Sequence, residues 1–346
     1  MPVTREIFEQ QCKRRFGTSN PERMRLEHWE WMIRHNAGPY GVRQDLGMKS
    51  NYFDCGPEGC KLVHEADWCF QRLGMSRTFM PDGRIICIAG EHEDSYDPDF
   101  CIYNDVTVLR PAPGQDCVTP DSGEVEMYAY PRSEFACTDF HSATLVGKQI
   151  YIIGRLGYGR DEGDPGPTPV YVLDTETYRI THLHPNGESP GWIHNHHGSY
   201  DTARHAITVR GGELYREQEP HKVSHFAAHR LYIEDLRWEL LCAQEKHRKF
   251  LLTETGGNCA EIPADAFRLR NVEHFWLPPE EQGVTVFAID VHGVRIRIED
   301  FYNDMRVHVD GELAPETLDK VLFELRHNLE NATTSQWRIR EVDLFR

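Results

Sequence analysis

The segment between residues 76 and 241 repeats one strand-forming pattern three times. In each repeat a short apolar strand runs into glycine at a tight bend, and a second strand follows later. The first strands cover residues 84–90, 149–154 and 205–212. A repeat of this kind indicates stacked or radially arranged sheets, because one unit buries its apolar face only against a neighbouring unit. We therefore expect a mainly β protein.

Long loops separate the two strands of each repeat. They cover residues 91–99, 155–169 and 213–228, and the second strands follow at 100–109, 170–174 and 230–238. Loops carried on a rigid sheet scaffold are the usual place for binding residues. Function is therefore expected in the loops, and the repeat is expected to supply the frame.

The second repeat shows the strand–glycine–strand pattern most completely. It reads His-Ser-Ala-Thr-Leu-Val-Gly-Lys-Gln-Ile-Tyr-Ile-Ile-Gly over residues 141–154, followed by Val-Tyr-Val-Leu-Asp over 170–174. The third repeat adds the double glycine Gly211-Gly212 and Trp238. This region resembles the kelch repeat family, whose four-stranded blades form a β-propeller.

The resemblance covers about half of the chain and implies a kelch-like β-propeller over residues 46–280. Glu91 and Arg155 stand where the family has its second glycine in the first two repeats. Three repeats do not close a ring of about four to eight blades. The resemblance therefore implies a small or atypical ring, or one that flanking segments complete.

Residues 1–45 are predicted to be a helical segment that covers one face of the sheets. Asn20-Pro21 is a cap followed by proline, which favours a helix start, and Gly38-Pro39 favours its end. Met24, Trp29, Met32 and Ile33 follow helical spacing between these signals.

Residues 281–346 are predicted to form an α+β portion. Val294, Ile296 and Ile298 alternate with arginines, as in a half-buried strand. The expected elements are strands at 283–291, 294–298 and 305–309, a helix that begins at Pro315, and a strand at 337–344. The alternative is that these strands are further blades that complete the propeller.

Charge and hydropathy limit the classes of partner. The formal net charge is −17, with 55 acidic against 38 basic residues. Nucleic-acid binding draws on clustered Lys and Arg, so a nucleic acid is not expected as the partner. No stretch approaches the roughly 18 consecutive apolar residues of a membrane span, so no membrane partner is expected. A basic protein or a metal cation fits the charge better.

The compartment is expected to be the cytoplasm. The first eight residues lack the apolar centre of a secretory signal peptide. The ten cysteines follow no regular framework, and Cys87 lies within an apolar strand. Reduced thiols are the interpretation that this pattern favours.

Two of the long loops supply the binding candidates. Residues 91–99 concentrate carboxylates, which would bind a basic partner or, as an alternative, a divalent metal ion through oxygen ligands. The loop lacks the spacing of an EF-hand. The candidate binding residues are Glu91, Glu93, Asp94, Asp97, Asp99, Arg155, Tyr158 and Arg160.

A histidine cluster supplies the metal candidates. On one strand, His194 and His196 would face the same side, a geometry that can chelate a transition metal. The candidate ligands are His194, His196, His197 and His141. The alternative is that each histidine makes local hydrogen bonds at a turn or a blade edge.

Catalytic motifs are scarce. No nucleophile elbow, phosphate-binding loop or His-Glu-x-x-His helix is present in the sequence. Asp139 stands close to His141 and could form an acid–base pair with it, but a single pair is weak evidence for catalysis.

The leading hypothesis is therefore a non-enzymatic protein–protein interaction module with no cofactor. One alternative is a metal-dependent enzyme with a His or acidic site at the propeller mouth. A further alternative is an acidic cytoplasmic inhibitor or immunity-type protein that neutralises a basic toxin.

Overall fold

The computed structural model describes most of the chain. The described residues are 3–48, 53–57, 59–62, 66–92, 100–115, 123–157, 166–215, 223–225, 227–243, 247–255, 266, 269, 274–277, 285–301 and 304–342. The chain divides into two compact units. Unit 1 comprises Met1–Ser224 with Leu231–Trp238, and unit 2 comprises His225–Arg230 with Glu239–Arg346.

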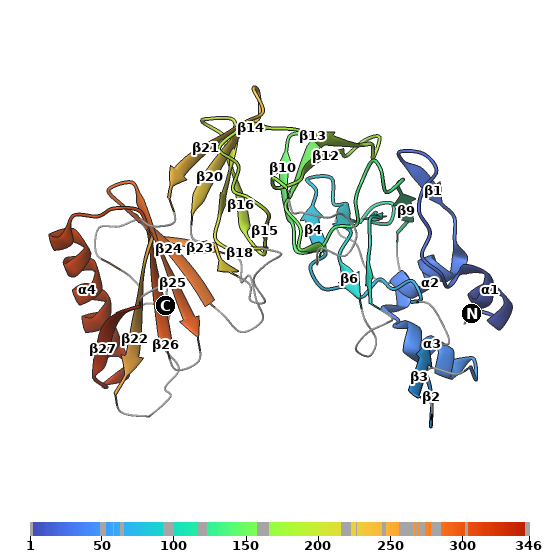
Figure 1. The fold of residues 1–346 in the computed structure, drawn as a ribbon, viewed down its shortest axis with the longest axis horizontal. Helices are drawn as coiled ribbons and strands as arrows, with labels where there is room; N and C mark the ends of the chain where they lie inside the picture. Colours follow the sequence, from blue (N-terminus) through green and yellow to red (C-terminus); the bar gives the residue numbers. More distant parts are fainter. Residues whose placement is uncertain are drawn as a thin grey trace. The chain divides into compact units, whose positions relative to one another are not determined.

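The protein is mainly β, and the three repeats form three sheets (Figure 1). In sheet order, the first contains β1 (Glu22–Met24), β9 (Val125–Ala129), β8 (Val106–Leu109), β5 (Ile85–Ile88) and β4 (Ser76–Phe79). The second contains β10 (Ser142–Val146), β11 (Gln149–Ile153), β12 (Val170–Asp174) and β13 (Ile180–Leu183). The third contains β14 (Asn186–Gly187), β21 (Arg237–Cys242), β20 (Ala228–Tyr232), β17 (Ala206–Arg210) and β16 (His197–Asp201).

The predicted first strands are confirmed as β5, β11 and β17. Short pairs of strands accompany the sheets. These are β2 (Phe53–Gly56) with β3 (Gly59–Leu62), β6 (Glu91–His92) with β7 (Cys101–Ile102), and β18 (Glu213–Leu214) between β15 (Ile193–His194) and β19 (Val223–Ser224).

The three sheets pack face to face in chain order. The middle strand β11 is apolar on both faces because it packs against both neighbouring sheets. Ile150 and Ile152 pack against the first sheet, whereas Tyr151 and Ile153 pack against the third. Successive strand residues point to opposite faces, so a strand between two sheets needs apolar residues at every position. Full burial of each such side chain stabilises the fold by about 1.5–3 kcal/mol.

The N-terminal segment covers the outer face of the first sheet, as predicted, but it is not one helix. It contains α1 (Arg5–Gln11), α2 (Glu27–His35) and α3 (Pro39–Asp45). Trp29 of α2 stacks on Trp68 at 4.4 Å between ring centroids, within the core that joins the helices to β9.

The predicted helix start at Asn20-Pro21 is wrong. The next residues form β1, in which Arg23 pairs with Tyr128 of β9. The Asn20 side chain caps no helix, because its amide donates to the carbonyl of Ile180 and its oxygen accepts from the N–H of the same residue. Sheet pairing outweighs the local cap signal here.

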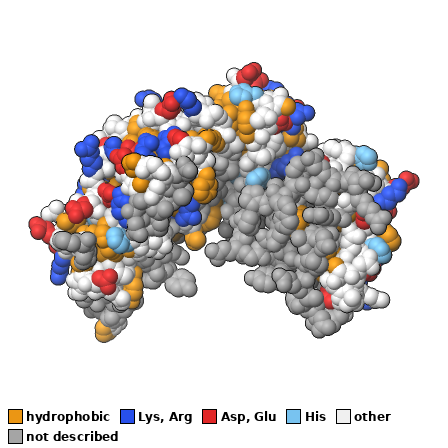
Figure 2. Space-filling view, turned by 180° about the vertical axis from the view of Figure 1, so that it is seen from behind, with side chains coloured by type: hydrophobic (Ala, Val, Ile, Leu, Met, Phe, Trp, Pro, Cys, Tyr) orange, Lys and Arg blue, Asp and Glu red, His pale blue; other side chains and the backbone are white. Residues whose placement is uncertain are grey.

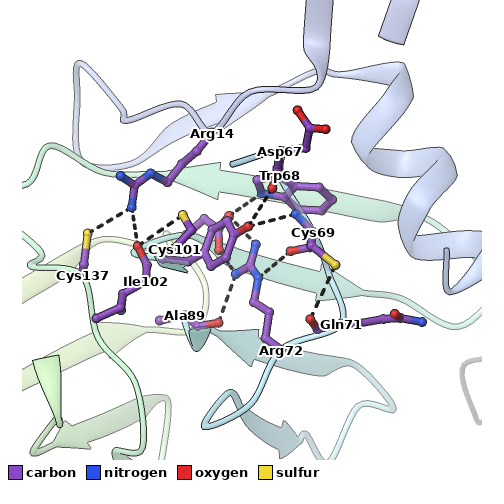
Figure 3. Close-up of polar contacts among 12 residues, drawn as sticks. Arg14, Asp67, Trp68, Cys69, Gln71, Arg72, Ala89, Cys101, Ile102 and Cys137 are labelled. Carbon is purple, nitrogen blue, oxygen red and sulfur yellow. Dashed lines mark hydrogen bonds and ion pairs between the residues drawn. The ribbon is translucent and has the colours of Figure 1, made fainter. Parts of the chain in front are cut away.

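A buried polar network ties the segment before β4 to the first sheet, with Arg72 at its centre (Figure 3). The Arg72 guanidinium forms a two-pronged ion pair with Asp105, and only 2% and 7% of these side chains are exposed. Asp105 also accepts a hydrogen bond from the indole of Trp68 at 2.8 Å. Arg72 further donates to the carbonyls of Cys69 and Ala89. The network satisfies groups that burial would otherwise leave unpaired.

Unit 2 is a six-stranded antiparallel sheet with one helix on one face (Figure 1). In sheet order it contains β23 (His274–Leu277), β24 (Thr285–Val291), β25 (Val294–Phe301), β26 (Asp304–Asp310), β22 (His247–Glu254) and β27 (Trp337–Val342). The helix α4 (Pro315–Thr333) buries Leu318, Leu322, Leu325 and Leu329 in the sheet core.

The predicted C-terminal strands and helix are confirmed, and the alternative of further blades is wrong. These strands join one helix-covered sheet and do not form four-stranded blades. The predicted boundary at residue 281 lies inside unit 2, because β22 pairs with β26 on one side and β27 on the other. That long-range pairing places residues from 247 onward in unit 2.

The described residues also show how surface charge is distributed, which cysteines are free thiols, and how apolar the helices are. On the face drawn in Figure 2, Lys and Arg side chains are interspersed with Asp and Glu. Cys12, Cys69, Cys87, Cys101, Cys137 and Cys242 are free thiols. None of the helices in the described ranges is long and apolar enough to cross a membrane.

Candidate functional site

The three repeats meet along one edge, which we call the turn edge. It consists of the lead-in segments 73–75, 139–141 and 194–196, which precede β4, β10 and β16, and of the glycine bends 90–92, 154–157 and 211–213. The middle residue of each lead-in segment is left-handed, with φ of 61° at Gly74, 49° at Phe140 and 54° at Asn195. The N–H of Phe140 donates to Gly74, and that of Asn195 donates to Phe140, at 3.0 and 2.8 Å. The lead-in segments therefore form a continuous hydrogen-bonded ladder.

Each of the first two glycine bends is bonded to the segment leading into the next repeat. The N–H of Gly90 donates to the carbonyl of Thr138 at 2.8 Å. The N–H of Arg155 donates to the carbonyl of Ile193 at 3.1 Å. The second bend needs glycine because a Cβ on Gly154 would lie 2.3 Å from the Ile193 oxygen. The repeats are thus locked in series by backbone contacts.

Two of the predicted metal ligands occupy equivalent positions in this ladder. His141 precedes β10, and its Nε2 lies 2.8 Å from the hydroxyl of Ser76, the first residue of β4. His196 precedes β16, and its Nε2 lies 2.9 Å from the hydroxyl of Ser142, the first residue of β10. Each histidine therefore bonds the serine of the preceding repeat.

The structure does not bring the four predicted histidine ligands together. His194 and His196 do not alternate along one strand, because the left-handed Asn195 separates β15 from β16. His197 opens β16 opposite Arg210. Within the described ranges, no group of three or more His, Cys, Asp and Glu residues is arranged to hold a metal ion.

A buried pair of carboxyl groups links the first two repeats. Glu91, from the first bend, interacts with Asp139, from the second lead-in segment, and their exposed fractions are 6% and 0%. Asp139 Oδ1 also accepts from the N–H groups of Leu156 and Gly157 at 3.1 and 2.9 Å. Burial raises the pKa of Asp139 despite these donors. Burial therefore favours the neutral form of the Asp139 carboxyl group.

Arg155 lies beside this pair and is also buried. Its guanidinium stacks over the ring of Trp192 at 4.9 Å and donates to the carbonyl of Cys137 at 2.8 Å. The Trp192 indole donates to the carbonyl of Leu156 at 3.2 Å. The charge of Arg155 opposes the rise in the Asp139 pKa. Arg155 therefore holds the bend and the carboxyl pair in one arrangement.

In the third repeat, a histidine and a glutamate take the place of the two carboxyl groups. His194 is fully buried, and its Nδ1 lies 3.7 Å from the carboxylate of Glu213 on the neighbouring strand β18. His194 and Asp139 both immediately precede the left-handed residue of their lead-in segments. The turn edge thus contains acid–acid and His–acid contacts at repeat-related positions.

The predicted site residues divide into three groups. Glu91 and Arg155 belong to the turn edge and flank Asp139. The four histidines also lie on or next to this edge but make separate contacts. The remaining binding candidates lie outside the described residues, and they are Glu93, Asp94, Asp97, Asp99, Tyr158 and Arg160.

In the structure, Asp139 and His141 have partners other than those that the sequence suggests. Asp139 and His141 do not form the predicted acid–base pair, because Asp139 accepts from the N–H groups of Leu156 and Gly157 and His141 bonds Ser76. Phe140, with its positive φ, separates the two side chains. Aligning the lead-in segments on their left-handed residue places Asp139 and His194 at the same position. The sequence had already named both residues, but in other roles, with Asp139 beside His141 and His194 as a metal ligand.

Replacing Asp139 by asparagine is expected to raise the melting temperature at pH 7. In the folded protein the pKa of this carboxyl is raised above its ordinary value of 3.8. Its contribution to stability is therefore complete below pH 3.8 and is lost as the pH rises through the raised pKa. Asparagine keeps an acceptor for the two N–H donors and removes the cost of ionisation.

Thermal unfolding of both proteins between about pH 4 and pH 7 measures this effect. The difference between variant and wild type should shrink towards the acidic end of the range. Asp201→Asn is the control of opposite sign, because hydrogen bonding by Arg204 lowers the pKa of Asp201. Equal destabilisation by Asp139→Asn at every pH would contradict a raised pKa.

The chain has matches among solved structures but none among family models or curated proteins. No family model matches the sequence, and no curated protein matches it. One solved structure with similarity is described as "Structure of YjhT", with 12% sequence identity and a TM-score of 0.30. The match covers 71% of this chain and 87% of that chain. That TM-score is too low to define a shared fold.

Proposed function

We propose that unit 1 is a kelch-like repeat scaffold that binds a basic segment of a partner protein at the turn edge. The observation that carries this proposal is that the long loops all begin at this edge. The segments 93–99, 158–165 and 216–222 directly follow the described residues His92, Gly157 and Tyr215. Backbone hydrogen bonds join the bends from which the first two segments leave to the next lead-in segment.

The charge of the first two segments selects the partner. Residues 93–99 carry four acidic and no basic residues, and residues 158–165 carry three acidic residues and Arg160. A cluster of one sign attracts a partner of the opposite sign and speeds their association. The buried carboxyl pair and Arg155 hold the origins of both segments in place. A lysine- or arginine-rich protein segment is therefore the partner that this edge fits.

The packing of the sheets supports a propeller-type arrangement. The sheets follow one another in chain order, and the strands β4, β10 and β16, which follow the lead-in segments, are neighbours. The N-terminal helices cover the outer face of the first sheet. A covered first face removes the need for another blade on that side. The arrangement we propose is therefore an arc of three blades with a helical cover.

Neutralising the acidic segment is expected to weaken binding of a basic probe about tenfold. The variant changes Glu93, Asp94, Asp97 and Asp99 to their amides, and the probe is a fluorescein-labelled octalysine peptide followed by anisotropy. Wild-type affinity should fall steeply as salt rises from about 50 to 300 mM, because exposed charges are screened. Capture from lysate with the same two proteins then identifies the natural partner.

The matched control changes the same number of acidic residues in unit 2, at Glu312, Glu316, Asp319 and Glu324. It alters the net charge equally but leaves the turn edge intact. Equal weakening by both variants would show that net charge alone attracts the probe. Binding that is indifferent to salt would also contradict the proposal.

A further inference from the structure

The face of the unit 2 sheet that α4 does not cover carries a strip of cations. Phe250, Val307 and Trp337 belong to the core under α4. Successive strand residues point to opposite faces, so the residues next to these lie on the other face. We call the following four residues the cationic strip: Lys249 of β22, Arg306 of β26, and Arg338 and Arg340 of β27.

The strand register makes these cations neighbours. Leu251 pairs with Arg306 on one side and with Arg340 on the other. Lys249 lies two residues along the same strand from Leu251. Adjacent strands are about 4.8 Å apart, so the four side chains occupy one continuous area. The strip runs from the middle of the sheet to β27.

Like charges crowd this area. Burial lowers the pKa of Lys249, and the neighbouring Arg306 lowers it further, against the opposing effect of Glu299. Glu299 is already engaged by His308 at 3.3 Å and by Arg297 at 3.7 Å. Adjacent like charges on a sheet are destabilising. An anionic partner would relieve this repulsion.

The two arginines of β27 are the accessible end of the strip. Arg338 and Arg340 are both exposed. In the described part of the chain, no acidic side chain forms an ion pair with either of them. They are therefore available to carboxylates from outside the unit.

β27 is also an edge strand. It pairs with β22 and is the last strand in the sheet order of the described elements. An edge strand presents backbone N–H and C=O groups on which another extended chain can add. Along β27, Arg338 and Arg340 belong to the cationic strip, while Ile339 between them packs against the core under α4. Charged and apolar side chains therefore alternate along this edge with the period of a β-strand.

We propose that the β27 edge binds an extended acidic segment of a partner protein by strand addition. On one face of the extended sheet, acidic side chains at alternate positions of that segment would lie beside Arg338 and Arg340. On the other face, the apolar residue between them would lie beside Ile339. The period of two and the apolar position between the charges match a peptide strand rather than a phosphate backbone. The net charge of −17 also opposes a polyphosphate partner. This surface is separate from the turn edge and takes a partner segment of the opposite charge.

The test measures anisotropy of a fluorescein-labelled nine-residue peptide of alternating Glu and Val with the full-length protein. We expect saturable binding, and at least about tenfold weaker binding to the double variant Arg338→Glu/Arg340→Glu. The matched control is Lys320→Glu/Arg326→Glu on α4, which changes the charge of unit 2 equally and should bind as wild type does. Circular dichroism confirms that each variant is folded.

Two further probes distinguish strand addition from attraction by charge alone and from binding of a nucleic acid. The same peptide with alternate backbone amides N-methylated keeps its charge but cannot pair with an edge, so it should bind at least about tenfold more weakly. Equal binding of both peptides would overturn strand addition. Tighter binding of a 12-nucleotide oligouridine would overturn the assignment to a peptide. No binding of the Glu-Val peptide would show that the arginines only protect the edge against aggregation.

Discussion

Replacing Asp105 by alanine is expected to lower the free energy of unfolding of unit 1 by about 3–5 kcal/mol. The substitution leaves the guanidinium of Arg72 buried without its counter-ion, with only 2% of that side chain exposed. It also removes the acceptor of the Trp68 indole. An unpaired buried charge costs far more than the ion pair contributes in net terms, and this asymmetry makes the effect large.

Urea unfolding, followed by hydrogen exchange of peptides from β5 and β8, measures this loss in unit 1. The double variant Arg72→Met/Asp105→Leu should recover part of the stability, because it removes both charges together. Glu9→Ala breaks the exposed pair with Arg5 and should cost no more than about 0.5 kcal/mol. An Asp105→Ala effect as small as that of Glu9→Ala would show that the Arg72 network does not stabilise the first sheet.

Replacing Gly154 by alanine is expected to cost at least about 3 kcal/mol, because two penalties combine. The residue has a φ of 78°, which L side chains rarely adopt. Its Cβ would also lie 2.3 Å from the Ile193 oxygen and 2.7 Å from the His196 ring. Either the second repeat must separate from the third, or the His196 bond to Ser142 must break.

Gly147→Ala is the matched control for this prediction. Gly147 has a φ of 60°, but nothing lies within 4 Å of the position of its Cβ. Its substitution should cost only the backbone strain, about 1–2 kcal/mol. Thermal and urea unfolding of the two variants compare the costs directly. Equal losses would mean that backbone conformation alone, and not the approach of the next repeat, requires glycine at position 154.

Local sequence patterns correctly predicted those strands and helices whose formation depends mainly on burial of their apolar residues. The apolar run of β11 required burial on both faces, and alternation in β25 required burial on one face. The leucines of α4 formed a helical stripe that packs on the sheet. The start at Asn20-Pro21 failed because the competing interaction, pairing of β1 with β9, joins residues about 100 positions apart.

The candidate site was predictable only in part. Glu91 and Arg155 were identified because they lie in the long loops 91–99 and 155–169, whereas nothing in the sequence linked Asp139 to Glu91. The contact between Glu91 and Asp139 joins different repeats, and only the seating of one repeat on the next creates it. Strand alternation placed His194 and His196 on one side, but the left-handed Asn195 between them removed that geometry.

By itself, the sequence determined that the chain has three sheet repeats, a helical cover and a C-terminal α+β portion. Each of these follows from periodicity and turn residues, which act over a few neighbours in the chain. Only the tertiary structure decided that the loops begin at one turn edge, that Glu91 and Asp139 are buried side by side, and that four cations line one face of unit 2. These features depend on strand register and on the contact of one sheet with the next. Such contacts join distant residues, and no local pattern encodes them.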